Sequence, residues 1–390
     1  MENCGESLIR SKAIETSNPH EICYMKIGFD ASLAFTPLRA GVPNYIHHLL
    51  DALLRTDMAN AYTVFHKKSQ KIFKKATGSN IQWQPLRCPT HHTLMWSQAR
   101  LPLALAWRSF DVTHVPGHRV PWVTGGRLIA TIYDLVFLKF PETLRSLHRH
   151  RLVWYTRQAV HRASHLITIS ETTKRAVCEA YEINPARVDV VYPGVDHATF
   201  RPDVARTKRS TPYVLAVGTL QPRKNHVMLI RAFKQLCARR RDPIELLIAG
   251  QRGWMWEPIE EEARKPPFAD RVHLLGYVAD EQLPSLYAGA ELVAIPSFYE
   301  GFGLPLLEAM ACGAPLIAAN IPAFSEATAD AALMLDPHDT EAWMEGMLEL
   351  LGSNERHQQL REKGLARARQ FSWERTARET LAIYRKVAAG

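Results

Sequence analysis

Short, continuously apolar segments, each followed by a helical pattern, constrain the fold of this chain most strongly. Tyr213-Val-Leu-Ala-Val-Gly218 and Glu245-Leu-Leu-Ile-Ala-Gly250 are apolar almost throughout and do not alternate with polar residues. Strands of this kind are covered by helices on both faces, as in a parallel sheet. Similar runs occur at residues 26–30, 62–65, 128–133, 165–170, 272–276, 291–296 and 315–319. The pattern predicts an α/β fold of doubly wound, Rossmann-like parallel sheets.

The length of the chain indicates more than one domain. Its 390 residues exceed the size at which a single hydrophobic core usually stops growing. A polar, proline-bracketed stretch at residues 200–212 separates two strand-like segments. We therefore expect two Rossmann-like domains that face each other across a cleft, with a last helix after them. The expected ranges are 25–205 for the N-terminal domain, 206–371 for the C-terminal domain and 372–390 for the helix.

Residues 1–24 precede the first predicted strand and have no place in this fold. We expect them to be a disordered tail or a start-site artefact, since Met25 would make a natural first residue. The six cysteines include no C-x-x-C pair, so neither a disulfide framework nor a zinc site is predicted. The apolar stretch Leu101–Trp107 is far shorter than the roughly 20 residues that cross a bilayer, and no secretory signal pattern is visible. These features predict a cytoplasmic protein.

The formal net charge of +9 indicates an anionic partner. Residues 66–75 and 145–162 interleave basic with apolar or aromatic residues, as interfacial helices do. Each stretch is either a solvated helix face or a surface that docks peripherally on an acidic membrane. Net charge alone also allows a nucleic-acid-binding protein, but no binding module is recognisable and no nucleic acid is expected. A Rossmann dehydrogenase is disfavoured, because no G-x-G-x-x-G followed by an acid is present.

The stretch from Ser297 to Gly313 follows a predicted strand and places Glu300 and Glu308 eight positions apart. Pro305 suits the first turn of a helix that ends at the final glycine. The free amides of that first turn would attract an anion such as a phosphate. Glu308 would then accept hydroxyl hydrogens, as from a ribose, and Glu300 would meet another part of the ligand. A simpler interpretation, with one acid at the positive helix end and one solvated acid, leaves the intervening glycines unexplained.

Two further loops at strand ends carry candidate phosphate ligands. In Val217–His226, Arg223 and Lys224 would offer a guanidinium and an ammonium group to a diphosphate. In Leu38–Leu50, Gly41 would let the main chain approach a ligand closely, although this segment alone indicates only a turn.

Together the three loops resemble those of retaining, nucleotide-sugar-dependent glycosyltransferases of the GT-B architecture, specifically family 4. The segment 297–313 is similar to that family's E-x7-E signature, and residues 218–225 are similar to its basic donor loop. Further similar pieces follow in order at residues 131–135, 169–171, 192–196, 275–277 and 372–374. The resemblance extends from Met25 to the C-terminus and leaves the substrate open.

The resemblance implies roles for the charged candidates. Glu300 would contact hydroxyls of the donor sugar, Glu308 would hold the ribose, and Asp134 would lie near the reacting sugar. Arg223 and Lys224 would neutralise the diphosphate leaving group, which stabilises charge that develops in the transition state.

The resemblance also implies roles for main-chain groups and neighbours. Residues beside the sugar and the diphosphate would be Gly41, Gly218, Gly301, Phe302, Gly303 and Leu304. Tyr133 stands where the family more often has His, so its phenol would either replace that sugar contact or point elsewhere. Glu326 matches an acid after the next strand and is expected to be structural.

The mechanism implied is front-face substitution with retention of configuration. A glycosidase-like double displacement needs two carboxyls close together, whereas eight residues of continuous helix would separate them by about 12 Å. The chain contains no D-x-D, so no catalytic metal is predicted, and the nucleotide sugar is a co-substrate rather than a cofactor. The motif order favours GDP-mannose as donor, and a glycan or a lipid-linked molecule as acceptor.

The acceptor would bind to the N-terminal domain, and by resemblance the last helix crosses back to that domain. Six aromatic or imidazole side chains lie on the expected acceptor side: Trp83, His91, His92, Trp96, His114 and His118. Taken singly, each of these six side chains is expected to be a core or surface residue. If they cluster near the cleft, they would form a platform for the acceptor.

Overall fold

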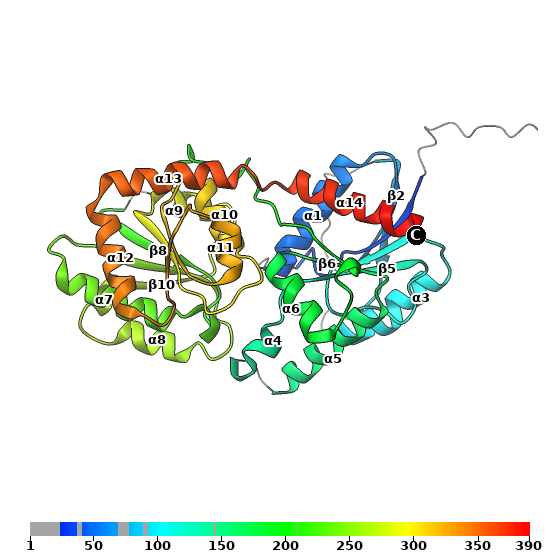
Figure 1. The fold of residues 1–390 in the computed structure, drawn as a ribbon, viewed down its shortest axis with the longest axis horizontal. Coiled ribbons are helices and arrows are strands. Elements are labelled where there is room, and N and C mark those ends of the chain that lie inside the picture. Colours follow the sequence, from blue (N-terminus) through cyan, green and yellow to red (C-terminus); the bar gives the residue numbers. More distant parts are fainter. Residues whose placement is uncertain (1–23, 37–40, 69–77, 89–92, 144–145, 208) are drawn as a thin grey trace, which may run out of the picture.

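The computed structural model describes residues 24–36, 41–68, 78–88, 93–143, 146–207 and 209–390. Figure 1 shows two α/β domains side by side, each built on one parallel sheet, which confirms the predicted fold class. Most of the predicted tail, residues 69–75 of the first basic stretch, and His91 and His92 lie outside the described residues.

The first sheet has seven parallel strands in the order β3-β2-β1-β4-β5-β6-β7. They are β1 (Lys26–Asp30), β2 (Ala61–Lys67), β3 (Ile81–Leu86), β4 (Val112–Val115), β5 (Arg127–Ile132), β6 (His165–Thr168) and β7 (Val188–Val190). The helices of this domain are α1 (Val42–Thr56), α2 (Thr93–Met95), α3 (Leu101–Ala106), α4 (Val136–Lys139), α5 (Ser146–Arg162) and α6 (Glu171–Tyr181). Ile27 pairs with Tyr62 on one side and Val112 on the other, so β1 is a central strand.

The second sheet has six parallel strands in the order β10-β9-β8-β11-β12-β13. They are β8 (Tyr213–Val217), β9 (Glu245–Ala249), β10 (Val272–Gly276), β11 (Leu292–Ile295), β12 (Leu316–Ala319) and β13 (Leu333–Leu335). Its helices are α7 (His226–Arg239), α8 (Glu257–Arg264), α9 (Leu283–Gly289), α10 (Leu304–Ala311), α11 (Pro322–Thr328), α12 (Thr340–Gly352) and α13 (Asn354–Ala368). The predicted boundary at residues 205 and 206 lies between β7 and β8.

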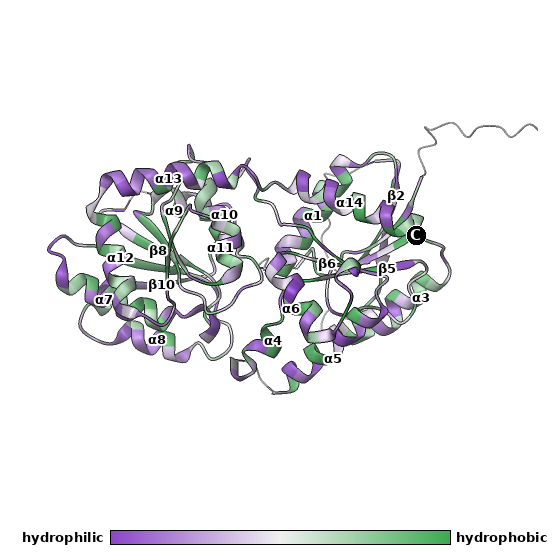
Figure 2. Cartoon of the chain, viewed as in Figure 1, coloured by the Kyte–Doolittle hydropathy of each residue, from purple (hydrophilic) through white to green (hydrophobic). Residues whose placement is uncertain are grey.

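The apolar strands form the two cores. Leu215, Leu247 and Val293 are fully buried, as continuous apolar runs covered by helices on both faces should be. Figure 2 shows hydrophobic residues concentrated along the central strands and hydrophilic ones on the outer helices. In the described ranges, no helix combines the length and the apolar character needed to cross a membrane.

The strand order creates one crevice in each domain. Both orders reverse beside the first strand of the sheet, between β1 and β4 and between β8 and β11. At such a switch point, the loops after two neighbouring strands turn to opposite faces of the sheet and leave room for a ligand. The loops that carry Arg223 and Glu300 follow β8 and β11, so the fold itself brings them together.

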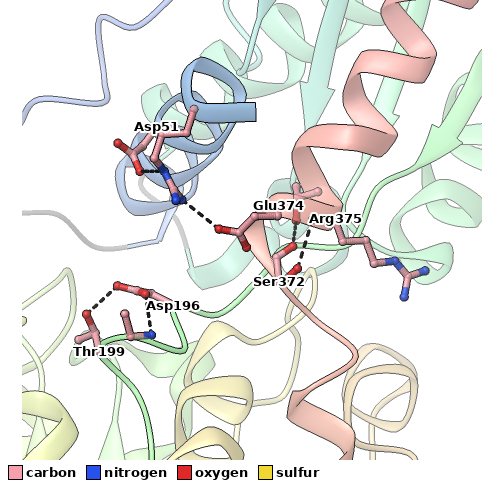
Figure 3. Close-up of polar contacts among 9 residues, drawn as sticks. Asp51, Asp196, Thr199, Ser372, Glu374 and Arg375 are labelled. Atoms are coloured by element: carbon pink, nitrogen blue, oxygen red, sulfur yellow. Dashed lines mark hydrogen bonds and ion pairs between the residues drawn. The ribbon is translucent and has the colours of Figure 1, made fainter. Parts of the chain in front are cut away.

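Helix α14 (Trp373–Ala389) follows α13 and returns to the first domain, where it packs beside α1. Tyr384 is fully buried, and its hydroxyl lies 2.6 Å from Nδ1 of His114 on β4. Ser372 caps the helix by accepting from the amide of Arg375 at 3.2 Å (Figure 3). Glu374 pairs with Arg55 at 3.0 Å, but these exposed groups contribute little compared with the buried apolar face of α14.

Candidate functional site

A cavity of about 330 Å³ lies between the domains at the switch point of the second sheet. The N-terminal domain contributes Gly41, Tyr133 and Asp134 to its wall. The C-terminal domain contributes Gly218, Arg223, Glu300, Gly301, Phe302, Gly303, Leu304 and Glu308. The structure therefore brings together every predicted site residue except Lys224, which is absent from the wall and contacts Glu300 instead.

Glu300 lies between two cations. Its Oε2 is 2.6 Å from Nη1 of Arg223, and its Oε1 accepts from Nζ of Lys224. All three side chains are at most 14% exposed. Burial alone would raise the pKa of Glu300, but Arg223 and Lys224 outweigh burial and lower it to about 2. Glu300 is therefore a fixed carboxylate at neutral pH, able to accept hydrogens and unsuited to act as a general base.

This pairing differs from the arrangement expected from the sequence, in which the cations meet a diphosphate and Glu300 meets a sugar. In the structure, the cations hold Glu300 as well. Arg223, Lys224 and Glu300 together carry one net positive charge, which the carboxylate of Asp134 in the same cavity offsets, since it interacts with both cations. Arg223 also retains a buried Nε that has no acceptor among the described residues. Arg223 therefore orients Glu300 and keeps a guanidinium donor for a phosphate.

Two glycines shape the loop between Glu300 and α10. A Cβ on Gly301 would lie 2.0 Å from the carbonyl oxygen of Tyr133, so only glycine allows this close approach of the two domains. Gly303 has a φ of 114°, which side chains rarely tolerate, and a Cβ there would lie 2.8 Å from Phe324. The glycines that the simpler interpretation left unexplained are thus required by the shape of the loop.

The loop offers backbone donors to the cavity. In the described part of the chain, the amides of Gly301, Phe302, Gly303 and Leu304 have no hydrogen-bond acceptor. Helix α10 begins at Leu304, one residue before the predicted start at Pro305, and its positive end adjoins these amides. A group of free donors at a helix N-terminus, two of them on buried residues, suits an anion such as a phosphate.

Glu308 lies in α10 and is 9% exposed. Its Oε2 accepts from the hydroxyl of Tyr287 at 2.8 Å. Burial, together with the charge of Asp280, raises the pKa of Glu308 to about 7, although the bond from Tyr287 opposes this rise. Unlike Glu300, this acid has no compensating cation among the described residues, so a ligand that donates hydrogens to it would favour its charged form.

Asp134 and Tyr133 reach the cavity from the loop after β5. Oδ1 of Asp134 accepts from the amide of Val136 at 3.0 Å, which orients the carboxylate. The hydroxyl of Tyr133 donates to the carbonyl of Pro116 at 3.1 Å, and its ring meets Tyr45 edge-on. The sequence left open whether the phenol of Tyr133 replaces the sugar contact or points elsewhere. In the structure it points elsewhere, to a carbonyl of the N-terminal domain.

Comparisons with known proteins identify the family of this chain. A model described as Glycosyltransferase Family 4 matches residues 39–199, and one described as Glycosyl transferases group 1 matches residues 200–367. O-antigen chain mannosyltransferase B of Escherichia coli is 32% identical over 304 residues, which cover 73% of this chain and 77% of that protein. The chain is a family 4 glycosyltransferase.

A second relative of this glycosyltransferase is D-inositol 3-phosphate glycosyltransferase of Salinispora tropica. It is 36% identical over 340 residues, which cover 80% of this chain and 68% of the relative. Among solved structures, sucrose-phosphate synthase from Thermosynechococcus elongatus superposes with a TM-score of 0.76 at 20% identity, covering 94% of this chain and 99% of that one. This likeness concerns the fold alone and confirms the GT-B architecture.

The glycosyltransferase has a second cavity, of about 280 Å³, at the switch point of its first sheet. Asp30 and Lys67 line it at the ends of β1 and β2, and His118 and Arg119 follow β4. Trp96 donates its Nε1–H to Oδ1 of Asp30 at 3.1 Å, which fixes the indole in the wall. Val42 lines both cavities, so the two are neighbours.

Of the side chains predicted to form an acceptor platform, some line the second cavity and others belong to the core. Trp96 and His118 line the second cavity. His114 is fully buried between Tyr384 and Thr131, and burial lowers its pKa to about 3, so it is a neutral core residue. Trp83 packs against the rings of Phe35 and His66. The sequence therefore predicted two members of the second cavity, while Asp30, Lys67 and Arg119 were missed.

Residues of the donor side were also missed. Asn225 has a left-handed backbone, and its Nδ2 donates to the carbonyls of Pro296 and Pro337 at 3.2 and 2.7 Å. It ties the basic loop to the end of β11. The sequence offered one signal for Asn225, namely its position directly after Arg223 and Lys224 in the loop that follows β8. Within the described ranges, no group of three His, Cys, Asp or Glu side chains is arranged to hold a metal ion.

Proposed function

We propose that this glycosyltransferase is a retaining, metal-independent hexosyltransferase. In this proposal it moves a hexose, mannose from GDP-mannose, to a glycan or a lipid-linked acceptor in polysaccharide or glycolipid assembly. The observation that carries the proposal is the cavity between the domains, where a carboxylate held by two cations adjoins four free backbone amides.

Each part of the nucleotide sugar has a matching group in this cavity. The amides of Gly301–Leu304 and the positive end of α10 would bind the diphosphate. Glu308 would accept both ribose hydroxyls, and its charge would be favoured by them. Glu300, ionised and fixed, would accept from hydroxyls of the hexose, with Asp134 on the opposite wall. Arg223 would stabilise the charge of the departing diphosphate.

The low pKa of Glu300 favours transfer without a protein base. An acceptor hydroxyl would attack the anomeric carbon from the face that the diphosphate leaves. The new C–O bond forms as the bond to the phosphate oxygen breaks, and that oxygen takes the acceptor proton. Configuration is retained because attack and departure share one face. Charge stabilisation by fixed donors supplies the catalysis in this scheme.

The identity of the donor rests on relatives and motif order. One relative is named a mannosyltransferase, whereas another of similar identity is named for D-inositol 3-phosphate. Both names concern sugar transfer, and the first, with its O-antigen product, supports mannose and a glycan acceptor.

The acceptor would bind in the second cavity. Trp96 offers an aromatic face, and Asp30, Lys67 and His118 offer polar contacts of the kind that orient a sugar. Because this cavity adjoins the donor cavity at Val42, a hydroxyl of a bound glycan could reach the donor sugar.

A peripheral contact with an acidic membrane would suit a lipid-linked acceptor. Trp107, Leu147 and Trp122 expose 84%, 77% and 54% of their surfaces on the N-terminal domain. Arg162 of the basic helix α5 lies over the ring of Trp122, 4.9 Å from its centroid. Exposed aromatic residues beside cations are typical of interfacial binding. We expect sedimentation with vesicles that contain anionic phosphatidylglycerol, and none with neutral phosphatidylcholine vesicles.

The direct test of the function is nucleotide release from a panel of GDP-, UDP-, ADP- and dTDP-sugars. We expect slow hydrolysis of one donor, and loss of this activity in Glu300→Gln and in Lys224→Ala. Lys363→Ala is a matched control, because Lys363 pairs with Asp330 on the surface at 2.7 Å. Normal turnover by both site variants would contradict the assignment. Salt-sensitive binding of DNA or RNA, with no stabilisation by any sugar nucleotide, would favour a nucleic-acid-binding protein instead.

A further inference from the structure

The donor loop is held by the opposite domain. The carbonyl oxygen of Gly301 accepts from the hydroxyl of Ser170 at 2.6 Å. Ser170 follows β6 of the first sheet, and it is fully buried at this interface. Its Oγ also caps α6 by accepting from the amide of Thr173 at 2.9 Å. Thr173, equally buried, donates to the carbonyl of Tyr133 at 3.2 Å.

The orientation of the Gly301 carbonyl matters for the donor. A trans peptide is planar, with its C=O and N–H pointing in opposite directions. Holding the carbonyl of Gly301 toward Ser170 therefore also sets the direction of the Phe302 amide, one of the four free amides at the cavity. Gly301 adjoins Glu300, so the same contact limits the position of the carboxylate.

A second contact joins the same helix to the C-terminal domain. Glu326 of α11 accepts from the amides of Glu171 and Thr172 at 2.6 and 3.1 Å. It also accepts from the hydroxyls of Thr172 and Tyr192 at 2.9 and 2.8 Å. A carboxylate from one domain thus satisfies the N-terminal amides of a helix in the other, where the helix dipole favours a negative charge. Glu326 was expected to be structural, and the structure gives it four hydrogen bonds between the domains.

We propose that Ser170 is a positioning residue for sugar transfer, and that Glu326 clamps its helix in place. When the domains close, the N-terminus of α6 is completed by Glu326, and Ser170 fixes the Gly301–Phe302 peptide against the donor. Both contacts are lost when the domains separate, so the donor loop would reach its working arrangement only in the closed form. This inference rests on the proposed function in one respect, namely that the donor binds at the loop.

The test compares Ser170→Ala with Glu326→Gln. Ser170→Ala removes the shorter of two hydrogen bonds to the Gly301 carbonyl and leaves that from the Thr173 hydroxyl at 3.4 Å. Glu326→Gln weakens the clamp without touching the cavity. We expect kcat for nucleotide release to fall about 2- to 10-fold in each, as the loss of one hydrogen bond implies. The dissociation constants of GDP and UDP, measured by calorimetry, should change less than 2-fold. A purely structural role would lower thermal stability without this separation of kcat from affinity.

Ser353→Ala is the matched control, since Ser353 caps α13 by accepting from the amide of Arg356 at 3.3 Å and makes no described contact with the other domain. It should keep kcat unchanged.

Small-angle scattering of the unliganded protein gives a readout without any donor, and both test variants should have a larger radius of gyration than wild type. Wild-type kcat and an unchanged radius of gyration in both variants would overturn the proposal. If Ser170→Ala does not fold, Glu326→Gln alone decides. If no donor is turned over by wild type, the proposed function fails and the scattering result decides this inference.

Discussion

Replacing Glu308 with glutamine should separate stability from donor binding. Burial raises the pKa of Glu308 from its ordinary value near 4.5 to about 7 in the folded protein. A pKa that is higher in the folded state means that the neutral carboxyl favours folding. This advantage is complete below pH 4.5 and is lost as the pH rises through 7.

The size of the effect follows from the two pKa values. A rise from 4.5 to about 7 corresponds to about 3 kcal/mol of destabilisation once the pH exceeds 7. Glutamine has a similar shape, carries no charge and can still accept from Tyr287. We expect Glu308→Gln to gain stability relative to wild type by roughly 1 kcal/mol at pH 5 and by about 3 kcal/mol at pH 8.

Urea denaturation at pH 5.0, 6.5 and 8.0, followed by far-ultraviolet circular dichroism, measures this difference. Glu349→Gln is the control, because that side chain is 57% exposed in the same domain and should show no such trend. The same Glu308→Gln variant should bind the nucleotide about 10- to 100-fold more weakly, since a hydrogen bond to a charged group is lost. A stability difference that is the same at all three pH values would refute the reasoning.

Other predictions follow from single contacts. Gly301→Ala places a Cβ 2.0 Å from the carbonyl oxygen of Tyr133, which the closed arrangement of the domains does not allow. The kcat for nucleotide release should therefore fall more than about 10-fold, while the melting temperature changes little. Unchanged turnover would argue against closure of the domains at this loop. Tyr384→Phe removes the hydroxyl beside His114 and should destabilise the protein by about 1–3 kcal/mol in urea, with donor affinity unaffected. Excess EDTA should leave nucleotide release unchanged, and activity that returns only with an added divalent ion would contradict a metal-independent mechanism.

The fold was predictable mainly for its central strands, although the edge strand β10 was also recognised. Nine apolar runs were assigned correctly, and the strands that were missed are mostly at sheet edges. β3, β7 and β13 lie at the edges of the two sheets, where one side lacks a neighbouring strand and short or polar sequences suffice. β3 even contains Pro85, which a central strand would not tolerate. β4 is central, but its sequence Val112-Thr-His-Val115 contains two polar residues and therefore gives no continuous apolar run.

The site was predictable where a loop directly follows a strand. Arg223 and Glu300 were each chosen from their own motif, but their contact depends on β8 and β11 being neighbours, which one sequence does not show. The same limit explains why the contact between Ser170 and Gly301 was missed, since it arises only when two domains meet. The pKa of Glu308 was likewise hidden, because it depends on burial and on Tyr287.

In this scheme the C-terminal domain binds a nucleotide diphosphate with backbone amides and Arg223, while Glu300 and Glu308 hold hydroxyls. A crystal structure of the protein with GDP or UDP tests this most directly. We predict the diphosphate at the amides of Gly301–Leu304 near Arg223, and the ribose hydroxyls on Glu308. A nucleotide bound elsewhere, or with its ribose away from Glu308, would contradict the account.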